Sequence, residues 1–164
     1  MSRYLKKPKH KSRPITVLFD DRERKPWSLP WPMKRKRLAA GDYTIEGYAE
    51  VMAIEKKSGL VELLGNLSGA DRIRFEKALL KLSKLPYKVM VIEDNYTNWP
   101  YALKAIEKKS GGRVVVNKTS LDCWLAKITM QYGIPVLFAG SPADEGLLVW
   151  LFKTAHEHVE GGAR

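Results

Sequence analysis

The nine residues VMAIEKKSG at positions 51–59 contain the strand around which the rest of the chain is expected to assemble. The run from Val51 to Ile54 is apolar and of β type, and it continues into Glu55 and Lys57. Because residues two apart in a strand point to the same face, these two charged side chains should project together. Asp42 opens a second predicted strand just upstream. We expect Glu55 and Lys57 to face the same side of the sheet as Asp42.

The hexapeptide IEKKSG, which begins at Ile54, occurs a second time at positions 106–111. The five residues before the second copy, YALKA, are typical of a helix. On a helix with 3.6 residues per turn, residues two apart diverge by about 200°. Glu107 and Lys109 should therefore separate, and only the first copy should form a site.

The charge of the chain favours a nucleic-acid partner. The 29 Lys and Arg against 18 Asp and Glu residues give a formal net charge of +11. Residues 1–13 carry six of these cations and no acid, and we predict that they form a basic disordered tail. A second cluster, Lys34, Arg35, Lys36 and Arg37, stands just before the Gly-Asp step at positions 41–42. Basic tails and patches commonly bind nucleic acid, whereas the alternative is a tag-like start that aids solubility.

Several classes of protein are excluded or disfavoured. The single cysteine, Cys123, rules out an internal disulfide and a multi-cysteine zinc site, and we predict an ordinary buried thiol. No apolar run approaches about 18 residues, and the start lacks the apolar core of a signal peptide. We expect a soluble intracellular protein of the cytoplasm or nucleoid, without a membrane partner and with a viral source left open.

Alternating strand and helix patterns predict an α/β domain with a central mixed sheet, spanning residues 14–160. Ser120 and Ser141 are the predicted N-caps of the last two helices. His156 and His158, near the end of the last helix, are predicted to be surface residues. The Pro-rich stretch 24–33 is predicted to be an irregular loop. The predicted strands cover 15–19, 43–45, 51–56, 88–93 and 135–139, and the predicted helices cover 60–67, 71–85, 99–109, 121–132 and 142–158.

Acidic residues stand near the ends of the first three predicted strands. Asp20 and Glu23 close the first strand, Asp42 opens the second, and Glu55 with Lys57 lies near the end of the third. Carboxylates without histidine or cysteine suit Mg²⁺ or Mn²⁺. A nearby lysine can orient or deprotonate a water, or stabilise charge on phosphorus, as phosphodiester hydrolysis requires. The alternative is that these acids are ordinary surface turn residues.

Taken in order, these motifs resemble the nuclease domain of the xeroderma pigmentosum group F family of structure-specific endonucleases. The family pattern is D-x-R-E, a G-D-[YF] step, and E-R-K followed by an acid. The matching segments here are VLFDDRE at 17–23, GDY at 41–43 and IEKKS at 54–58, with weaker similarity at 63–67, 72–76 and 133–138. The resemblance covers about residues 15–158.

The resemblance implies a restriction-endonuclease-like three-layer fold with a PD-(D/E)-x-K active site, in a compact prokaryotic or viral form. It further implies a Mg²⁺-dependent endonuclease, a hydrolase of DNA repair or recombination, that cuts DNA at flaps, forks or junctions. By carry-over, Asp42 and Glu55 are the main metal ligands and Lys57 the catalytic lysine. Asp20 and Glu23 are further ligands or supporting acids. The cations expected to contact DNA are Arg22, Lys56, Arg72, Arg74 and the cluster of Lys34, Arg35, Lys36 and Arg37.

The chain departs from the family pattern at three places. Lys56 replaces the family's arginine, at what we predict to be an exposed position. Val61 replaces the acid expected six residues after Glu55, and Glu62 follows one position late. A one-residue shift rotates a helical side chain by about 100°, so we do not expect Glu62 to take the role of that acid. No helix-hairpin-helix tandem is recognisable, so the basic tail or a partner is expected to grip the DNA.

Alternative functions remain open at this stage. A catalytically idle DNA-binding or scaffolding subunit is one, although such copies usually lose the Asp, Glu and Lys set. A junction resolvase or restriction-type nuclease on the same core is another. The last predicted helix carries LLVWLF at 147–152, apolar nearly all round. By this pattern, and by the resemblance, we expect a homodimer through the late helices.

Overall fold

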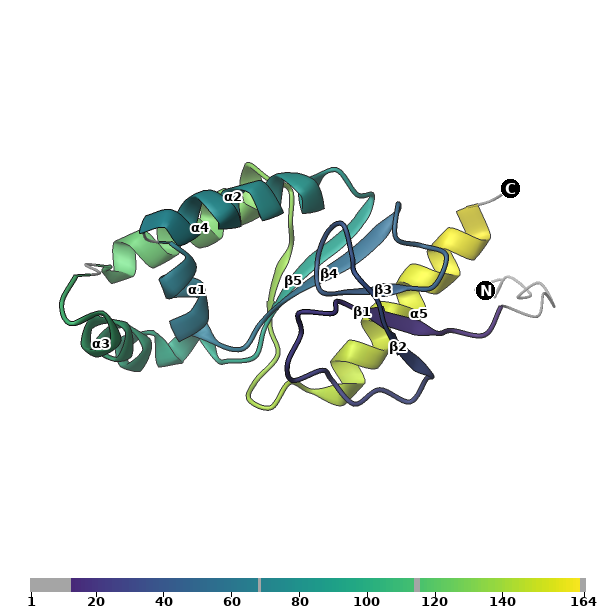
Figure 1. The fold of residues 1–164 in the computed structure, drawn as a ribbon, viewed down its shortest axis with the longest axis horizontal. Coiled ribbons are helices and arrows are strands. Elements are labelled where there is room, and N and C mark those ends of the chain that lie inside the picture. The colour runs from purple at the N-terminus through teal and green to yellow at the C-terminus, as the bar shows by residue number, and fades with distance from the viewer. Residues whose placement is uncertain (1–12, 68, 114–115, 163–164) are drawn as a thin grey trace, which may run out of the picture.

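A six-stranded mixed sheet organises the part of the chain that the computed structural model describes, residues 13–67, 69–113 and 116–162 (Figure 1). The strand order is β2-β1-β3-β4-β5-β6. The pairs β1–β3 and β3–β4 are antiparallel, and the others are parallel. The predicted tail therefore lies outside the described residues except for Arg13. The strands are β1 (Val17–Phe19), β2 (Met33–Arg35), β3 (Tyr43–Ile45), β4 (Met52–Lys57), β5 (Tyr87–Ile92) and β6 (Val136–Phe138).

Five α-helices cover the two faces of the sheet, which confirms the predicted α/β layered class. Helices α1 to α4 gather on one side, and α5 lies on the other (Figure 1). Their bounds are α1 (Leu60–Asn66), α2 (Gly69–Ser83), α3 (Trp99–Ser110), α4 (Lys118–Met130) and α5 (Glu145–Gly162), with one 3₁₀ turn at Tyr96–Asn98. None of these helices is both long enough and apolar enough to cross a bilayer, within the described part of the chain.

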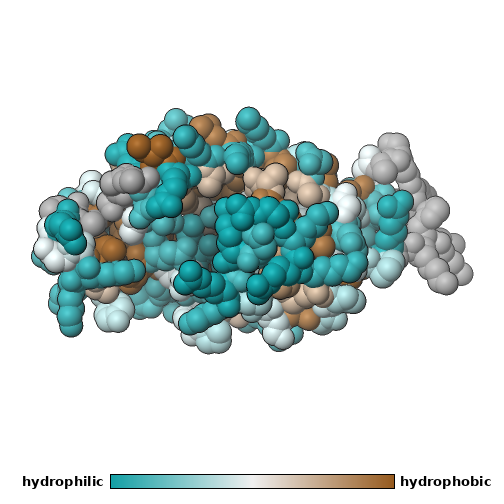
Figure 2. Space-filling model, viewed as in Figure 1, coloured by the Kyte–Doolittle hydropathy of each residue, from teal (hydrophilic) through white to brown (hydrophobic). Residues whose placement is uncertain are grey.

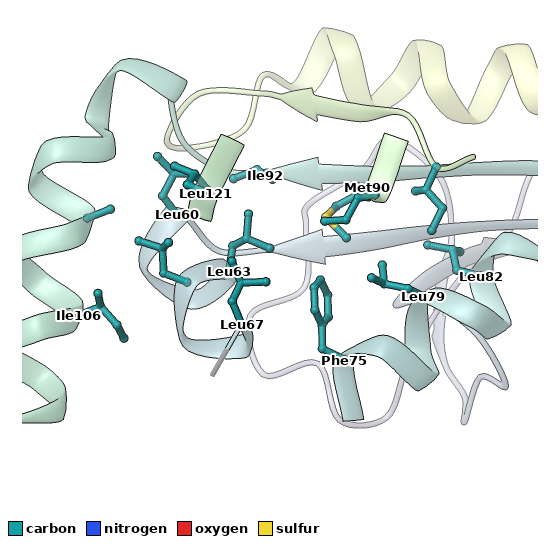
Figure 3. Packing of buried hydrophobic residues seen from close by; sticks show 14 of the residues in the cluster. Leu60, Leu63, Leu67, Phe75, Leu79, Leu82, Met90, Ile92, Ile106 and Leu121 are labelled. Atoms are coloured by element: carbon teal, nitrogen blue, oxygen red, sulfur yellow. The ribbon is translucent and has the colours of Figure 1, made fainter. Parts of the chain in front are cut away.

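The two central strands divide their side chains between two cores. Met90 and Ile92 of β5 pack with α1 to α4, and the residues between and beside them, Val89 and Val91, pack with α5. This alternation follows from the two-residue repeat of a strand buried on both faces. Figure 3 shows Leu79 and Phe75 of α2 pointing toward β5 in the first core. The core thus fixes α2 above the strand ends that carry the predicted acids.

The edge strand β2 departs from the sequence-based expectation. It pairs in parallel with β1, with Met33 opposite Val17 and Arg35 opposite Phe19. The Pro-rich stretch before it favoured a loop, because proline cannot donate to a strand ladder. Proline is nevertheless tolerated beside an edge strand, and Pro32 uses its carbonyl to accept from Val17 N at 2.9 Å.

The predicted N-caps of the last two helices are both wrong by a few residues. Asn117 caps α4, since its Oδ1 accepts from Ser120 N at 2.8 Å. The last helix begins at Glu145, and Asp144 Oδ1 accepts from Leu147 N at 2.7 Å. Asn and Asp are as good caps as Ser, so the choice among neighbouring polar residues depends on where the preceding loop delivers the chain.

Two predicted exposures are also wrong. Cys123 is exposed, because α4 turns Leu121 and Ile128 inward and a residue two from Leu121 lies on the opposite side. His156 is buried, because it shares a face of α5 with Phe152 and its Nδ1 lies 2.8 Å from the Tyr48 hydroxyl. The other histidine of this helix, His158, is exposed as predicted.

Candidate active site

Asp42 follows a tight turn and stands where β3 meets both neighbouring strands. Its N–H donates to Ile54 O at 2.8 Å, and its carbonyl accepts from Asp20 N at 2.8 Å. Gly41 has a φ of 66°, and a Cβ there would lie 2.9 Å from Ile54 O, so this close approach requires glycine. The side chain is also held, since Lys56 N donates to Asp42 Oδ2 at 2.7 Å. The fold therefore fixes this carboxylate beside β4.

Glu55 and Lys57 project from the same face of β4, as strand alternation predicted. Lys57 Nζ donates to Glu55 Oε1 at 2.9 Å and lies 5.0 Å from the centre of the Phe75 ring. Their side chains are only 12% and 8% exposed. In the second copy of the hexapeptide, Glu107 and Lys109 lie in α3 and are exposed. The two copies thus adopt the strand and helix environments that were predicted for them.

Glu62 contacts Lys57 at the end of β4, although the one-residue shift gave no reason to expect it there. Its Oε1 lies 3.6 Å from Lys57 Nζ, and its Oε2 accepts from Ser58 N at 2.8 Å and Ser58 Oγ at 2.6 Å. The chain turns sharply between β4 and α1, so the first turn of the helix folds back over the end of the strand. A rotation of about 100° gives the direction of a side chain around the helix axis. The contact with Lys57 also depends on where α1 lies relative to β4, which the rotation does not give.

Lys56 is buried, so the expectation of an exposed charge at this position is wrong. Its side chain is 5% exposed, and its amine donates to Lys25 O at 2.5 Å. The same amine lies 3.5 Å from Glu23 Oε2, 3.6 Å from Glu93 Oε2 and 5.6 Å from the centre of the Trp27 ring. Trp27 Nε1 in turn donates to Glu93 Oε1 at 2.7 Å. Lys56 therefore ties the loop after β1 to the end of β5.

Asp20 is fully buried and is already engaged by three donors. Its Oδ1 accepts from Arg22 Nε at 2.5 Å and Arg22 N at 3.1 Å, and its Oδ2 accepts from Leu38 N at 2.8 Å. Burial raises the pKa of Asp20, but these hydrogen bonds outweigh it and lower the pKa. In the described part of the chain, no three Asp, Glu, His or Cys side chains group at metal-binding distances.

The electrostatics of the site are dominated by two neighbouring, largely buried carboxylates, Asp42 and Glu55. Burial and then the charge of Glu55 raise the pKa of Asp42 to about 7, against the hydrogen bond from Lys56 N. Burial would lower the pKa of Lys57, but the charges of Glu55 and Glu62 outweigh it and raise that pKa. At neutral pH Lys57 is therefore a cation, and Asp42 is poised between its two protonation forms.

Two clefts meet at this pair of carboxylates, and Arg22, Asp42 and Glu55 line both of them. The first, here called the loop cleft, has a volume of about 440 Å³ and contains Glu62 and the loop after β1. The second, the α2 cleft, has a volume of about 500 Å³ and runs along α2. Figure 2 shows strongly hydrophilic side chains gathered in the middle of this face, where Figure 1 places the first strands.

The other cations predicted to contact DNA lie at different distances from the carboxylates. Arg74 lines the α2 cleft, whereas Arg72 lies 5.3 Å from the centre of the Trp124 ring on α4. The basic cluster occupies β2 and the segment after it, at the edge of the sheet. Two of its members are paired, Lys34 with Glu46 and Arg37 with Asp21, both at 3.0 Å.

Glu93 and two lysines of α2 also belong to this region, and none of them was predicted from the sequence. Glu93 lines the loop cleft, and Lys77 and Lys81 line the α2 cleft. A signal for Glu93 was available, since it follows a buried strand that pairs in parallel with the strand of Glu55 and Lys57. The ends of parallel neighbours meet at one edge of a sheet. Nothing local distinguishes the two lysines from other lysines of a surface helix.

Comparison with known proteins identifies one domain family and solved structures with a similar fold. A model of the ERCC4 domain matches residues 19–149. XPF from Aeropyrum pernix has a similar fold, with a TM-score of 0.59 and 19% identity over 91% of this chain and 64% of that one. The structure of XPF from Aeropyrum pernix in complex with DNA gives a TM-score of 0.61 and 18% identity over 88% and 66%. No curated protein matches the sequence.

The present chain thus spans slightly less than two thirds of the length of these two structures, and at such low identity the likeness shows the fold. The domain model reaches further, because it matches from the end of β1 into the first turns of α5 and includes the acids of all three motifs. On that match, the chain belongs to the ERCC4 domain family, as its resemblance to the xeroderma pigmentosum group F nuclease domain predicted.

Proposed function

We propose that this chain is a divalent-metal-dependent DNA endonuclease that hydrolyses phosphodiester bonds, preferentially at flaps, forks or junctions, in DNA repair or recombination. The observation that carries the proposal is that Asp42 and Glu55 stand where two clefts meet, with Lys57 bonded to Glu55 in the loop cleft. Membership of the ERCC4 domain family and the similarity to an XPF that was solved in complex with DNA support it.

The residues present fit a hard divalent cation. Asp42 and Glu55 could supply oxygen ligands. Burial and then the charge of Glu55 raise the pKa of Asp42, and a bound cation would offset both effects. Mg²⁺ or Mn²⁺ held there would supply polarisation of the phosphate and activation of a water. We propose that Asp20 supports the site without binding the ion directly, because its oxygens already accept hydrogen bonds from Arg22 and Leu38.

The remaining side chains have separate tasks in this proposal. Lys57 stays protonated beside Glu55 and Glu62, so it stabilises negative charge that builds on the phosphate rather than removing a proton. Arg22 is 61% exposed at the mouth of both clefts and can contact a phosphate while it remains bonded to Asp20. Glu23, held by Lys56, shapes the wall of the loop cleft.

Cleavage of labelled flap, fork and duplex DNA, with and without Mg²⁺ or Mn²⁺, tests this function. Asp42→Asn and Glu55→Gln should each reduce cutting by at least roughly 100-fold, the scale of losing one preorganised electrostatic group. DNA binding should persist, because removing a negative charge does not weaken phosphate attraction. Glu107→Gln is the matched control from the second hexapeptide, and an equal loss in that variant would refute the assignment.

An idle DNA-binding or scaffolding subunit is the competing proposal. Calorimetric titration with Mn²⁺ separates the two without a choice of DNA substrate. An active copy should bind the ion in the wild type and lose most of that binding in Asp42→Asn, whereas an idle copy should show no difference. We also propose an intracellular location and a homodimer through α5, which is taken up below.

A further inference from the structure

The α2 cleft leads away from the carboxylate pair along a row of cations. Arg74, Lys77 and Lys81 are exposed on one side of α2, while Phe75 and Leu79 turn into the core. Positions spaced by three and four residues share a helix face, so the three cations form one line. At 1.5 Å per residue the line is roughly 10 Å long, which is the scale of a short run of phosphates on one strand.

Two of these three cations are not neutralised within the protein. Arg74 is paired with Asp71, but among the described residues the side-chain amines of Lys77 and Lys81 have no ion-pair or hydrogen-bond partner. The carboxylates among the described residues that line this cleft are Asp42 and Glu55 at its inner end. A chain of phosphates would therefore meet free positive charge along α2 before it reaches the proposed reaction site.

The opposite wall of the cleft is made of small residues. Ala39, Ala40 and Gly41 form it, and Ala78 lies between the cations on the helix. A cleft of about 500 Å³ has the volume of a cube about 8 Å on edge, which is smaller than a DNA duplex, since the major groove of B-DNA alone is roughly 12 Å wide. This size suits one sugar-phosphate strand better than a duplex.

We propose that the α2 cleft holds one unpaired strand of the nucleic-acid substrate, with Lys77 and Lys81 on its phosphates, and directs that strand to Asp42 and Glu55. This inference rests on the proposed nuclease function and adds the strand's path and its single-stranded character. A branched substrate presents such an unpaired strand beside its duplex.

The test is binding of a fluorescent single-stranded oligonucleotide and a duplex of equal length, measured by anisotropy in EDTA at several salt concentrations. Lys77→Gln/Lys81→Gln should weaken single-strand binding about 5- to 10-fold at low salt. The slope of log K against log salt should fall in magnitude by about 1.4, at roughly 0.7 per phosphate contact on a single strand. Duplex binding should change less.

Lys104→Gln/Lys108→Gln is the matched control, because it removes an equally spaced pair of exposed lysines from α3. Equal losses in the two double variants, an unchanged salt slope, or no single-strand binding by the wild type would overturn the proposal. So would tighter binding of a polyglutamate peptide, which would indicate an acidic protein as the occupant. Because the assay needs no cleavage, a chain that fails to cut DNA but shows the predicted difference refutes the proposed activity and keeps the strand path.

Discussion

Asp42 connects the conformation of single residues to the proposed chemistry. Glycine at position 41 allows the chain to approach Ile54 closely, and Lys56 N then holds one carboxylate oxygen of Asp42. In that position burial and Glu55 raise the pKa of Asp42 to about 7, from an ordinary value of 3.8. The same arrangement that prepares a cation site therefore makes the ionised, metal-free protein less stable.

The stability of an Asp42→Asn variant relative to the wild type should depend on pH, because the variant lacks the carboxyl group with the raised pKa. Below about pH 4 Asp42 is protonated in both folded and unfolded chains, so the variant gains nothing. As pH rises from about 4 through about 7, the unfolded chain releases its proton first, and the wild type loses stability. At pH 8 in EDTA we expect the variant to be more stable by up to about 4 kcal/mol, given a pKa that rises from 3.8 to about 7 and about 1.4 kcal/mol per pKa unit.

Urea unfolding at pH 4 and pH 8 measures this difference, with Glu107→Gln as the control at an exposed carboxylate. Saturating Mn²⁺ should reverse the order at pH 8, because only the wild type binds the ion tightly. A variant that is less stable than the wild type at pH 8 in EDTA would contradict the raised pKa.

At the scale of elements, Lys56 on β4 connects the loop after β1 to the end of β5. Its amine donates to Lys25 O and forms ion pairs with Glu23 and Glu93. The indole N–H of Trp27 donates to Glu93. Trp27 also stacks on Tyr43 at 4.3 Å and donates its backbone N–H to the Tyr43 hydroxyl. One buried cation thus holds two acids and an irregular loop against the sheet.

Lys56→Met should destabilise the protein by about 3 kcal/mol, since removing one partner leaves the charges of Glu23 and Glu93 poorly compensated. Lys56→Arg should be milder because it retains the charge. Lys36→Met, at an exposed lysine of the basic cluster, should change the free energy of unfolding by no more than about 0.5 kcal/mol. Chemical denaturation of the three variants checks the order, and equal stability of Lys56→Met and Lys36→Met would refute this role.

At the scale of the whole molecule, an apolar groove lies on the α5 side of the sheet, away from the candidate site. It has a volume of about 390 Å³ and is lined by α5 and the starts of β4 and β5, including Met52, Tyr87, Leu147 and Leu151. Trp150 beside it is 62% exposed. Apolar surface of this kind is typical of an interface, and it supports the proposed homodimer through α5.

Trp150→Glu should shift a dimer toward monomer, because a buried charge at the centre of an interface is costly. Sedimentation velocity at several protein concentrations measures the shift. Tyr101→Glu provides the control, since Tyr101 is 73% exposed on α3. A wild type that sediments as a monomer at all concentrations would exclude the homodimer.

Local patterns sufficed for much of the fold and for the centre of the site. The apolar run at β4 made it a strand, and strand alternation alone put Glu55 and Lys57 on one face. In the second hexapeptide the preceding residues favour a helix, and the prediction that Glu107 and Lys109 lie on a helix is confirmed. Such predictions succeed when the relevant geometry is contained within one element and its period.

The tertiary structure decided what depends on contacts between distant segments. Lys56 became buried because the Trp27 loop folds over it, and Glu62 reached Lys57 because α1 turns back over β4. Lys77 and Lys81 line a cleft because the Gly41 turn lies opposite α2. The sequence by itself determined the helices, the described strands other than β2, and the shared face of Glu55 and Lys57 on β4. Which side chains meet across elements was settled by packing, because burial depends on what covers a residue, and that is not encoded in its neighbours along the chain.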